Sequence, residues 1–363
     1  MVDKRANIKT TLKIEPVPKG TPLKLAPIED DSESETYKTF QEWSQTQNQK
    51  ATKKIEKTPI APKYKALLEK YPEILKVNFK AKEVKHGVTH TIVTGTNTPC
   101  TSKPRPLMPG SPKAVQGEKN WRELEDLGIT EPVNPEDANL WTSPLLLTPK
   151  PDGELRVCGD FRGLNGKTEL DGYPLPNLKN FNGKIKGSTV FSKIDLTKAY
   201  HQIPLCPESM KKTTVVTQWG AWQFRRLPMG LRNSAQSFQR LIDTVLAGME
   251  NIVVYMDDIL VYSKNQKEHM ETLEEIFKRL EAAGLAINAK KCIFGQQTVE
   301  FVGYVVNRDG ITPLQRKVDA IAKFPPPQKQ KHLLGFLGAL NYYRHTLPRF
   351  NKKSPAQILQ PLY

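Results

Sequence analysis

The residues best suited to chemistry in this sequence are two adjacent carboxylates, Asp257 and Asp258, which lie between the apolar segments 252–254 and 259–261. Such segments predict the two strands of a β-hairpin with the carboxylates at its turn. A lone Asp-Asp turn is more often structural, because Asp tolerates the backbone that a turn requires. The pair therefore needs a further carboxylate elsewhere in the chain before it indicates a function.

Asp195 supplies that carboxylate, since it follows the apolar segment 190–194 and precedes Leu196. This places it at the end of a buried strand, where a carboxylate needs a partner or a metal ion. Carboxylates from two strands can hold two divalent cations about 4 Å apart, which stabilise the attacking and leaving oxygens of a phosphoryl transfer. Mg²⁺ suits such a site because it prefers oxygen ligands. The structural alternative is that Asp195 caps the segment 197–201.

The segments around these residues mix strands and helices without regular βαβ alternation, which predicts the α+β class. A hairpin is predicted over 145–158, with Lys150 and Arg156 near its tip. Further strands are predicted over 190–196, 215–216, 223–224, 252–255, 259–262 and 301–306. Helices are predicted from Ser111 to Gly128, from 233 to 249, and from about 270 to Gly284.

Composition excludes several classes of protein. The chain has 363 residues and a net charge of +16, which favours a polyanionic partner such as nucleic acid. The longest apolar stretch, 333–340, is too short to span a bilayer, and the first residues lack the apolar core of a secretory signal. We therefore expect an intracellular protein that is not secreted. The four cysteines are widely spaced, which disfavours zinc and a disulfide framework.

Five blocks of residues appear in the order and spacing of reverse transcriptases. They are 191–196 (FSKIDL), 200–204 (YHQIP), 227–231 (LPMGL), 238–239 (FQ) and 255–258 (YMDD). The flanking segments 158–165 (CGDFRGLN), 173–176 (YPLP) and 341–344 (NYYR) look like the gypsy-type branch of LTR retrotransposons. The sequence resembles the reverse transcriptase region of a retrotransposon Pol polyprotein over roughly residues 64–363.

This resemblance implies an α+β right-hand polymerase fold, with fingers, a palm whose antiparallel sheet carries the carboxylates, and a thumb. It implies two Mg²⁺ ions, with Mn²⁺ as a substitute, held by Asp195 and Asp257 directly and supported by Asp258. These three Asp residues would be the catalytic and metal-binding residues. Tyr255 and Met256 would support the motif.

The resemblance also implies contacts with the substrates. Lys150 and Arg156 would grip the incoming triphosphate, and Tyr200 would place its ring under the sugar and reject a 2′-hydroxyl. Met229 and Gly230 would form the floor of the nucleotide pocket, although retroviral relatives carry Gln at the position of Met229. A primer grip would be formed by Val302, Gly303 and Tyr304. Each of these residues has a plain structural alternative, in the core or on a solvated hairpin.

The implied function is an RNA-directed DNA polymerase that extends a primer on an RNA or DNA template with dNTPs. Its alternatives are a catalytically silent remnant that only binds nucleic acid, and a subunit that pairs with a second copy or with a longer Pol copy. The implied location is a cytoplasmic virus-like particle, with the nucleus as a further compartment, and no membrane is implied.

Four regions are predicted along the chain. They are a disordered segment (1–62), an extended lead-in strap (63–110), fingers and palm (111–310), and a thumb with the start of a connection region (311–363). The sequence contains no Asp-Thr/Ser-Gly before residue 100, and too few residues follow Phe350 for a ribonuclease H. We therefore expect polymerase segments only, from a longer Pol polyprotein or from a truncated copy.

Overall fold

The computed structural model describes residues 60–81, 84–133, 141–150, 153–176, 181–325 and 328–343. Nearly all of the predicted disordered segment, 1–62, lies outside these residues. Contacts divide the chain into two units, residues 54–311, and residues 312–363 together with 1–53. The two units are described separately below.

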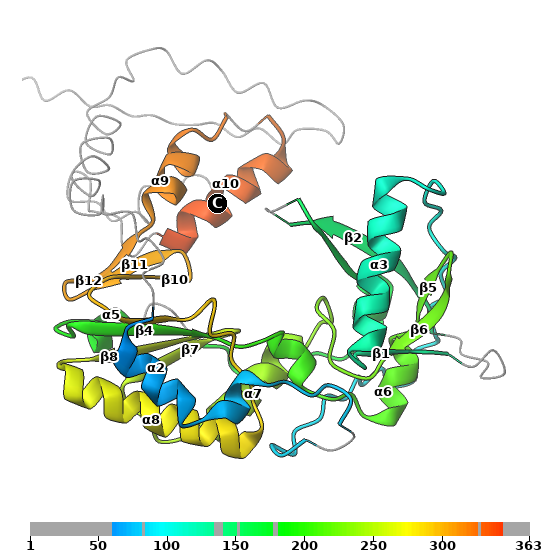
Figure 1. Ribbon diagram of the computed structural model, residues 1–363. Coiled ribbons are helices and arrows are strands. Elements are labelled where there is room, and N and C mark those ends of the chain that lie inside the picture. The colour runs from blue at the N-terminus through cyan, green and yellow to red at the C-terminus, as the bar shows by residue number, and fades with distance from the viewer. Residues whose placement is uncertain are drawn as a thin grey trace, which may run out of the picture. The chain divides into compact units, whose positions relative to one another are not determined.

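The palm of the larger unit is a four-stranded antiparallel sheet in the order β7-β8-β4-β9. Its strands are β4 (Val190–Asp195), β7 (Ile252–Tyr255), β8 (Asp258–Ser263) and β9 (Ile293–Gln296). Helices α7 (Ser234–Val245) and α8 (Gln266–Ala283) lie together with α2 (Pro62–Glu69) on one side of this sheet (Figure 1). The opposite face packs with β10 (Val299–Phe301) and β11 (Tyr304–Asn307) in a separate hydrophobic cluster.

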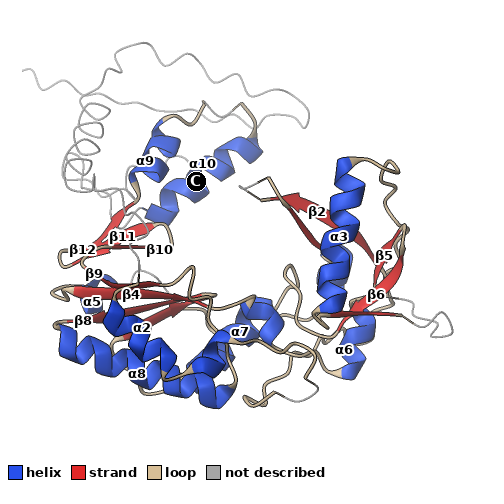
Figure 2. Cartoon of the chain, viewed as in Figure 1, coloured by secondary structure: helices blue, strands red, loops and turns tan. Residues whose placement is uncertain are grey.

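The fingers contain a five-stranded sheet in the order β1-β6-β5-β2-β3, covered by helix α3 (Pro112–Asp126) (Figure 2). Its strands are β1 (Thr130–Pro132), β2 (Ser143–Pro149), β3 (Leu155–Gly159), β5 (Val215–Thr217) and β6 (Gly220–Phe224). The α3 side chain Trp121 is fully buried, with its ring centroid 6.0 Å from Trp222 and 5.8 Å from Phe224 on β6. Aromatic packing therefore fixes the helix on the sheet.

Short helices connect these layers. They are η1 (Pro72–Leu75), α4 (Arg162–Lys167), α5 (Phe181–Ile185), η3 (Ala199–Gln202) and α6 (Pro207–Lys212). Strand β12 (Gly310–Pro313) follows β11 in a three-stranded sheet of the order β10-β11-β12. The lead-in helix α2 packs closely on the palm, because the Tyr64 ring stacks on Phe294 at 5.6 Å. A Cβ at the neighbouring Gly295 would lie 1.9 Å from the Tyr64 hydroxyl, so only glycine fits beneath this ring.

The smaller unit contains two described helices, α9 (Gln315–Ala322) and α10 (Gln330–Tyr343). Phe324 contacts Phe336 with 5.4 Å between ring centroids, and Leu337 and Tyr343 are buried. Among the described residues of both units, no helix has the length and apolar character needed to cross a membrane.

Most predicted elements are present where the sequence placed them. Helix α3 begins after Ser111, whose hydroxyl accepts a hydrogen bond from the Ala114 amide at 3.2 Å, and α8 ends at Gly284 in the left-handed conformation. The hairpin turn differs by one residue, because Asp258 belongs to β8 and pairs with Tyr255. The turn residues are therefore Met256 and Asp257, and Met256 carries the positive φ of 51°.

Three buried histidines link the stability of this fold to pH. Burial lowers the pKa of His90, His201 and His269 to about 4 in each case. Unfolding returns each ring to water, where its pKa is about 6.5. The unfolded state therefore binds more protons between pH 6.5 and 4, and the stability that these neutral rings contribute is present above pH 6.5 and is lost as the pH falls.

We expect the free energy of unfolding to fall by about 2 kcal/mol for each such histidine between pH 7.5 and pH 5. Urea titrations at both pH values measure this change. The variant His269→Gln should show a shallower acid dependence, whereas His332→Gln, which alters an exposed ring, should behave like the wild type. Equal unfolding free energies at the two pH values would contradict the prediction.

Candidate active site

The three predicted carboxylates come together at one end of the palm sheet. Asp195 is the last residue of β4 and pairs directly with Asp258, the first residue of β8. Directly opposed residues of antiparallel strands project their side chains to the same face. That face is the one opposite the helices. Phe191 and Leu260 lie an even number of residues from Asp195 and Asp258 on the same strands, so they project to the same face, and both belong to the hydrophobic cluster with β10 and β11. Asp257 lies immediately before Asp258, in the turn between β7 and β8.

Asp257 has the most perturbed environment of the three carboxylates. Its Oδ1 atom is buried and has no hydrogen-bond partner among the described residues. Burial, together with the negative charges of Asp258 and Asp195, raises the pKa of Asp257 to about 6, while Arg156 and Lys291 oppose this rise. A buried carboxylate oxygen without a donor is costly, so the site is incomplete without a positive group.

The other two carboxylates each have a cation nearby. The Asp258 carboxylate forms an ion pair with Lys193 on β4, at 2.9 Å from Nζ. Burial raises the pKa of Asp195, and Lys291 partly offsets that effect. The Asp195 backbone is also fixed, because its carbonyl accepts a hydrogen bond from the Asn288 amide at 2.8 Å.

The donor set fits divalent cations only in part. In the described ranges of the chain, no three Asp, Glu, His or Cys side chains already converge in a metal-binding arrangement. The orphaned Oδ1 atom of Asp257 and the neighbouring Asp195 are hard oxygen donors of the kind that Mg²⁺ prefers. Asp258 differs from them because Lys193 already neutralises it. Asp195 and Asp257 would therefore hold a metal directly, and Asp258 would take a supporting place.

The fingers hairpin β2–β3 contributes two cations. Lys150 follows β2, and its Nζ lies 2.5 Å from a Glu154 carboxylate oxygen, so its charge is partly neutralised by its own hairpin. Arg156, on β3, lowers the pKa of Asp257, which means that its positive charge acts on the carboxylate site. Of the two predicted triphosphate-binding residues, Arg156 therefore has the clearer electrostatic link to the carboxylates.

Tyr200 is half-buried in η3, close to the carboxylates. Burial, with the charges of Asp257 and Tyr255, raises the pKa of its hydroxyl to about 12. Its ring packs at 5.5 Å on Phe238 of α7. Tyr200 is thus both a packed side chain and a neighbour of the carboxylates, and its predicted contact with the sugar stays a prediction.

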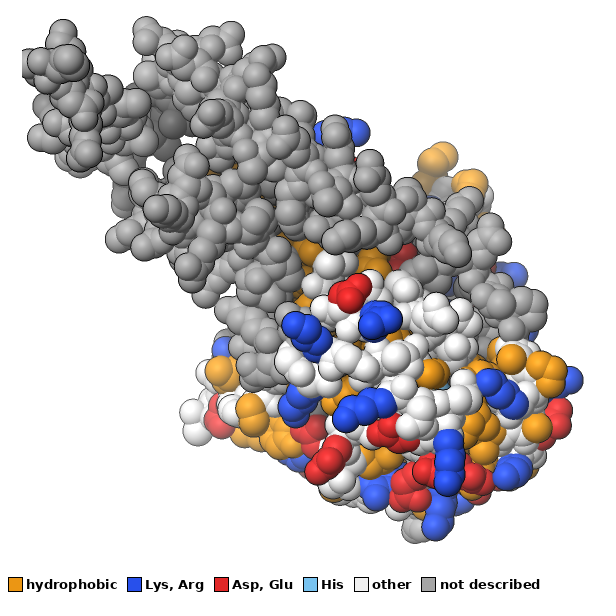
Figure 3. All heavy atoms as spheres, turned by 90° about the vertical axis from the view of Figure 1, so that its left-hand side faces the viewer, with side chains coloured by type: hydrophobic (Ala, Val, Ile, Leu, Met, Phe, Trp, Pro, Cys, Tyr) orange, Lys and Arg blue, Asp and Glu red, His pale blue; other side chains and the backbone are white. Residues whose placement is uncertain are grey.

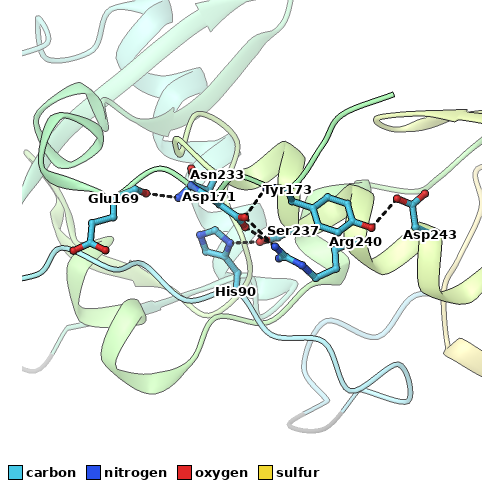
Figure 4. A network of polar contacts seen from close by, with 8 residues as sticks. All are labelled: His90, Glu169, Asp171, Tyr173, Asn233, Ser237, Arg240 and Asp243. Atoms are coloured by element: carbon cyan, nitrogen blue, oxygen red, sulfur yellow. Dashed lines mark hydrogen bonds and ion pairs between the residues drawn. The ribbon is translucent and has the colours of Figure 1, made fainter. Parts of the chain in front are cut away.

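A polar network fixes α7, the helix beneath Tyr200, to the segment that follows α4. Arg240 binds both oxygens of Asp171, at 3.0 and 2.8 Å, and its guanidinium lies 4.6 Å from the centre of the Tyr173 ring (Figure 4). One turn earlier in α7, the Ser237 hydroxyl is 2.7 Å from Nδ1 of the buried His90. The network therefore ties the lead-in segment and the α4–α5 segment to the helix that supports Tyr200.

The predicted pocket floor, Met229-Gly230, is attached to the fingers through its backbone. The Cys158 thiol on β3 donates to the Met229 carbonyl at 2.8 Å. The Asn165 amide donates to the Gly230 carbonyl at 2.7 Å, and its oxygen accepts from the Arg232 amide. These contacts join residues about 70 positions apart, and neither Cys158 nor Asn165 was assigned a site role from the sequence.

The predicted primer grip is a tight turn between β10 and β11. Phe301 pairs with Tyr304, and the two central residues, Val302 and Gly303, have φ values of 45° and 83°. Positive φ at both central positions is the geometry of a type I′ hairpin, which matches the twist of the strands. Val302 and Gly303 thus form a tight turn between two paired strands. The predicted contact of this turn with the primer stays a prediction.

Two cations near the carboxylates were not predicted from the sequence to lie there. Lys193 precedes Asp195 by two residues, so strand alternation places both side chains on one face and could have indicated the ion pair of Lys193 with Asp258. The charge of Lys291 acts on Asp195 and Asp257. Lys291 lies nearly a hundred residues after Asp195, so the sequence carries no local signal for this effect.

Comparison with known proteins agrees with this architecture. Residues 148–306 match the family model described as reverse transcriptase (RNA-dependent DNA polymerase). The foamy viral protease-reverse transcriptase in complex with an RNA/DNA hybrid superposes with a TM-score of 0.67 at 23% identity, covering 97% of this chain and 44% of that one. The complex of the same relative with double-stranded DNA gives a TM-score of 0.69 at 25% sequence identity, and the match covers 89% of this chain and 65% of that one. The chain therefore has the right-hand polymerase fold of the α+β class.

The sequence relatives are Pol polyproteins of transposable elements. The chain is 34% identical over 307 residues to the retrovirus-related Pol polyprotein from transposon 297 of Drosophila melanogaster, covering 83% of this chain and 28% of the relative. It is also 34% identical to the Tf2-3 transposon polyprotein of Schizosaccharomyces pombe, and this match covers 71% of this chain and 19% of the relative. The match to the reverse transcriptase family model covers residues 148–306, which is less than half of the chain, and the chain spans less than a third of these two transposon relatives.

Proposed function

We propose that this chain is an RNA-directed DNA polymerase that adds deoxynucleotides to a primer 3′-hydroxyl. The observation that carries the proposal is that Asp195 and Asp258 pair on one sheet face, with Asp257 beside them in the β7–β8 turn, within a right-hand polymerase fold. Two of these carboxylates lie at the ends of paired strands and are rigidly placed. The third, Asp257, has a buried oxygen with no donor among the residues that the structure describes, as expected of a group that awaits a cation.

Two bound Mg²⁺ ions would supply Lewis-acid chemistry, lowering the pKa of the primer hydroxyl and neutralising charge on the triphosphate. Mn²⁺ is proposed as a substitute. The chain's own residues do the positioning, since Asp195 at the end of β4 and Asp257 in the β7–β8 turn would hold the reaction centre. Asp258 keeps Lys193 beside that centre, and Arg156 brings positive charge from the fingers. Catalysis then rests on prearranged charge and orientation.

The proposed substrates are dNTPs and an RNA or DNA template with its primer. Lys150 and Arg156 would contact the triphosphate, Met229 and Gly230 would form the pocket floor, and Tyr200 would pack under the sugar. The solved foamy viral relatives were bound to an RNA/DNA hybrid and to double-stranded DNA, which supports a duplex partner here. Pairing with a second copy or a longer Pol copy, and action in a cytoplasmic particle or the nucleus, are part of the same proposal.

Primer extension tests the proposal most directly. The full chain is incubated with oligo(dT)-primed poly(A), dTTP and Mg²⁺, and the lengthening of the primer is followed on a gel. Lengthening of the primer would support the proposed polymerase activity. Failure to extend under conditions where the chain still binds the primed template would favour a catalytically silent binding protein.

Binding of the primed template should depend strongly on salt. Basic residues toward the end of the chain, such as Lys290, Arg316 and Lys317, are proposed to contact phosphates, and each contact releases counterions. The face seen in Figure 3 mixes acidic and basic side chains over its described part, so it offers no single-sign surface for a duplex. We expect affinity to fall at least about tenfold between 50 and 200 mM salt in a fluorescence anisotropy titration. An affinity that does not change with salt would contradict phosphate contacts.

A further inference from the structure

Lys193 places a positive charge among the carboxylates at the end of the palm sheet. It lies on β4 two residues before Asp195, so the two side chains project to the same face. Its direct partner on β8 is Leu260, and Asp258 lies two residues before that partner. Asp258 is therefore the diagonal neighbour of Lys193 on this face, within reach of a long side chain. The contact is made, because Nζ of Lys193 lies 2.9 Å from Oδ2 of Asp258.

The other neighbours of Lys193 on this face are apolar. Phe191 lies two residues earlier on β4, Leu260 is opposite on β8, and Ile293 is opposite on β9. All three belong to the hydrophobic cluster with β10 and β11 or pack against it. Only 22% of the Lys193 side chain and 25% of the Asp258 side chain are exposed. Among the residues that the structure describes, Lys193 forms no second ion pair, so Asp258 is its counterion.

This ion pair competes with a divalent cation for the same carboxylate. Asp195 and Asp258 are directly opposed on paired strands, where two negative charges repel each other. The ammonium group of Lys193 relieves that repulsion without a metal. Recruitment of Asp258 to a divalent cation would leave Lys193 unpaired among apolar side chains, where an isolated charge is costly. Asp195 and Asp257 can bind a cation without that cost.

We propose that Lys193 is a positioning residue that weakens the binding of divalent cations to the carboxylate site by keeping Asp258 in an ion pair. The inference rests on the proposed function and adds to it a residue that sets the strength of metal binding. The affinity of a carboxylate site for a divalent cation depends on the number and charge of its ligands. Removal of the Lys193 charge should therefore let Asp258 join Asp195 and Asp257, and the site should bind a cation more tightly before any nucleotide is present.

Substitutions of Lys193 and a matched control separate this role from packing. Lys193→Met removes the charge and keeps an unbranched chain that suits the apolar surroundings, whereas Lys193→Arg keeps the charge. Lys264→Met makes the same change at an exposed position directly after β8, at the opposite end of that strand from Asp258. Thermal unfolding without metal shows which variants are folded. Lys193→Gln, which also removes the charge, replaces Lys193→Met if the latter is unfolded.

Titration of the full chain with Mn²⁺, without nucleotide or template, gives a readout that needs no turnover. Electron paramagnetic resonance measures the free Mn²⁺. For Lys193→Met we expect the Kd for Mn²⁺ to fall by about tenfold, because a third carboxylate becomes available. Lys193→Arg and Lys264→Met should stay within about threefold of the wild type. Equal Kd values for the wild type and Lys193→Met, or no binding by either, would overturn the inference.

The double variant Lys193→Met/Asp258→Asn shows whether the lysine acts through Asp258. Lys193→Met is compared in the wild type and in the Asp258→Asn background, so that the coupling between the two side chains is isolated. We expect the Kd for Mn²⁺ to change by about tenfold when Asp258 is present and by less than about threefold when it is replaced. Equal changes in both backgrounds would mean that Lys193 only repels the cation from a distance, and would overturn the inference.

Primer extension with varied Mg²⁺ keeps this inference distinct from the polymerase proposal. Lys193→Met should reach half of its maximal rate at a lower Mg²⁺ concentration than the wild type, and Lys264→Met should match the wild type. If the wild type does not extend a primer but Lys193→Met binds Mn²⁺ more tightly through Asp258, the role of Lys193 stands and the polymerase proposal fails. If the wild type extends a primer and Lys193→Met binds Mn²⁺ as the wild type does, the polymerase proposal stands and the role of Lys193 fails.

Discussion

The variant Asp257→Asn should lose primer extension by at least about a thousandfold, equivalent to about 4 kcal/mol of transition-state stabilisation. The amide has nearly the shape of the carboxylate but lacks its charge, so the substitution removes a proposed metal ligand without opening a cavity. The wild-type Oδ1 atom is buried and makes no hydrogen bond within the described residues. Extension rates of the two proteins on oligo(dT)-primed poly(A) measure the effect.

Duplex binding separates this loss from misfolding. Asp257→Asn should bind the primed template about as tightly as the wild type, because contacts with phosphates lie elsewhere. The variant Asp309→Asn changes an exposed aspartate in the β11–β12 turn and should extend primers normally. Undiminished extension by Asp257→Asn would remove this carboxylate from the reaction centre.

The variant Tyr200→Ala should incorporate ribonucleotides far more readily than the wild type. In the proposed complex the Tyr200 ring lies under the sugar and collides with a 2′-hydroxyl, so its removal should shrink the preference for dTTP over UTP by at least about tenfold. The ratio of kcat/KM for the two nucleotides measures this preference. Because the ring packs on Phe238, truncation should also cost about 2–4 kcal/mol of stability.

The variant Tyr200→Phe distinguishes the ring from its hydroxyl. It keeps the packing on Phe238 and should retain the wild-type preference for dTTP, since the proposed collision involves the ring face. Thermal unfolding of Tyr200→Ala shows whether the protein is folded at the assay temperature. An unchanged nucleotide preference in a folded Tyr200→Ala would leave Tyr200 as a core residue only.

The sequence predicted the palm hairpin and the α+β class because their signals are local. Apolar segments of strand length flank Asp257 and Asp258, and the segment before Asp195 has the same character, so both strands were placed within a residue or two. The turn was misplaced by one residue because Asp is common in turns, whereas Met256 has no preference for positive φ. Cross-strand register decided which residues form the turn.

Other parts of the site depend on contacts that local patterns do not encode. The Cys158 thiol on β3 donates to the Met229 carbonyl, and the charges of Arg156 and Lys291 act on Asp257 from two other segments. None of these interactions has a periodicity or a spacing that reveals it. The roles of Asp195, Asp257 and Asp258, of the nucleotide-binding residues and of the primer grip come from resemblance, and they stay predictions until the variants are measured.

The residues that precede the family match pack against residues within it, which bears on how this part of the chain could be exchanged between related sequences. The family match begins at residue 148, yet Tyr64 fills the space over Gly295, and Trp121 fills the space against Trp222. His90, also outside the match, is bound to Ser237 within it. The residues that match the family model are therefore fewer than the residues that pack together in the fold. A recombination event that exchanged 148–306 alone would separate the proposed reaction centre from side chains that pack against it.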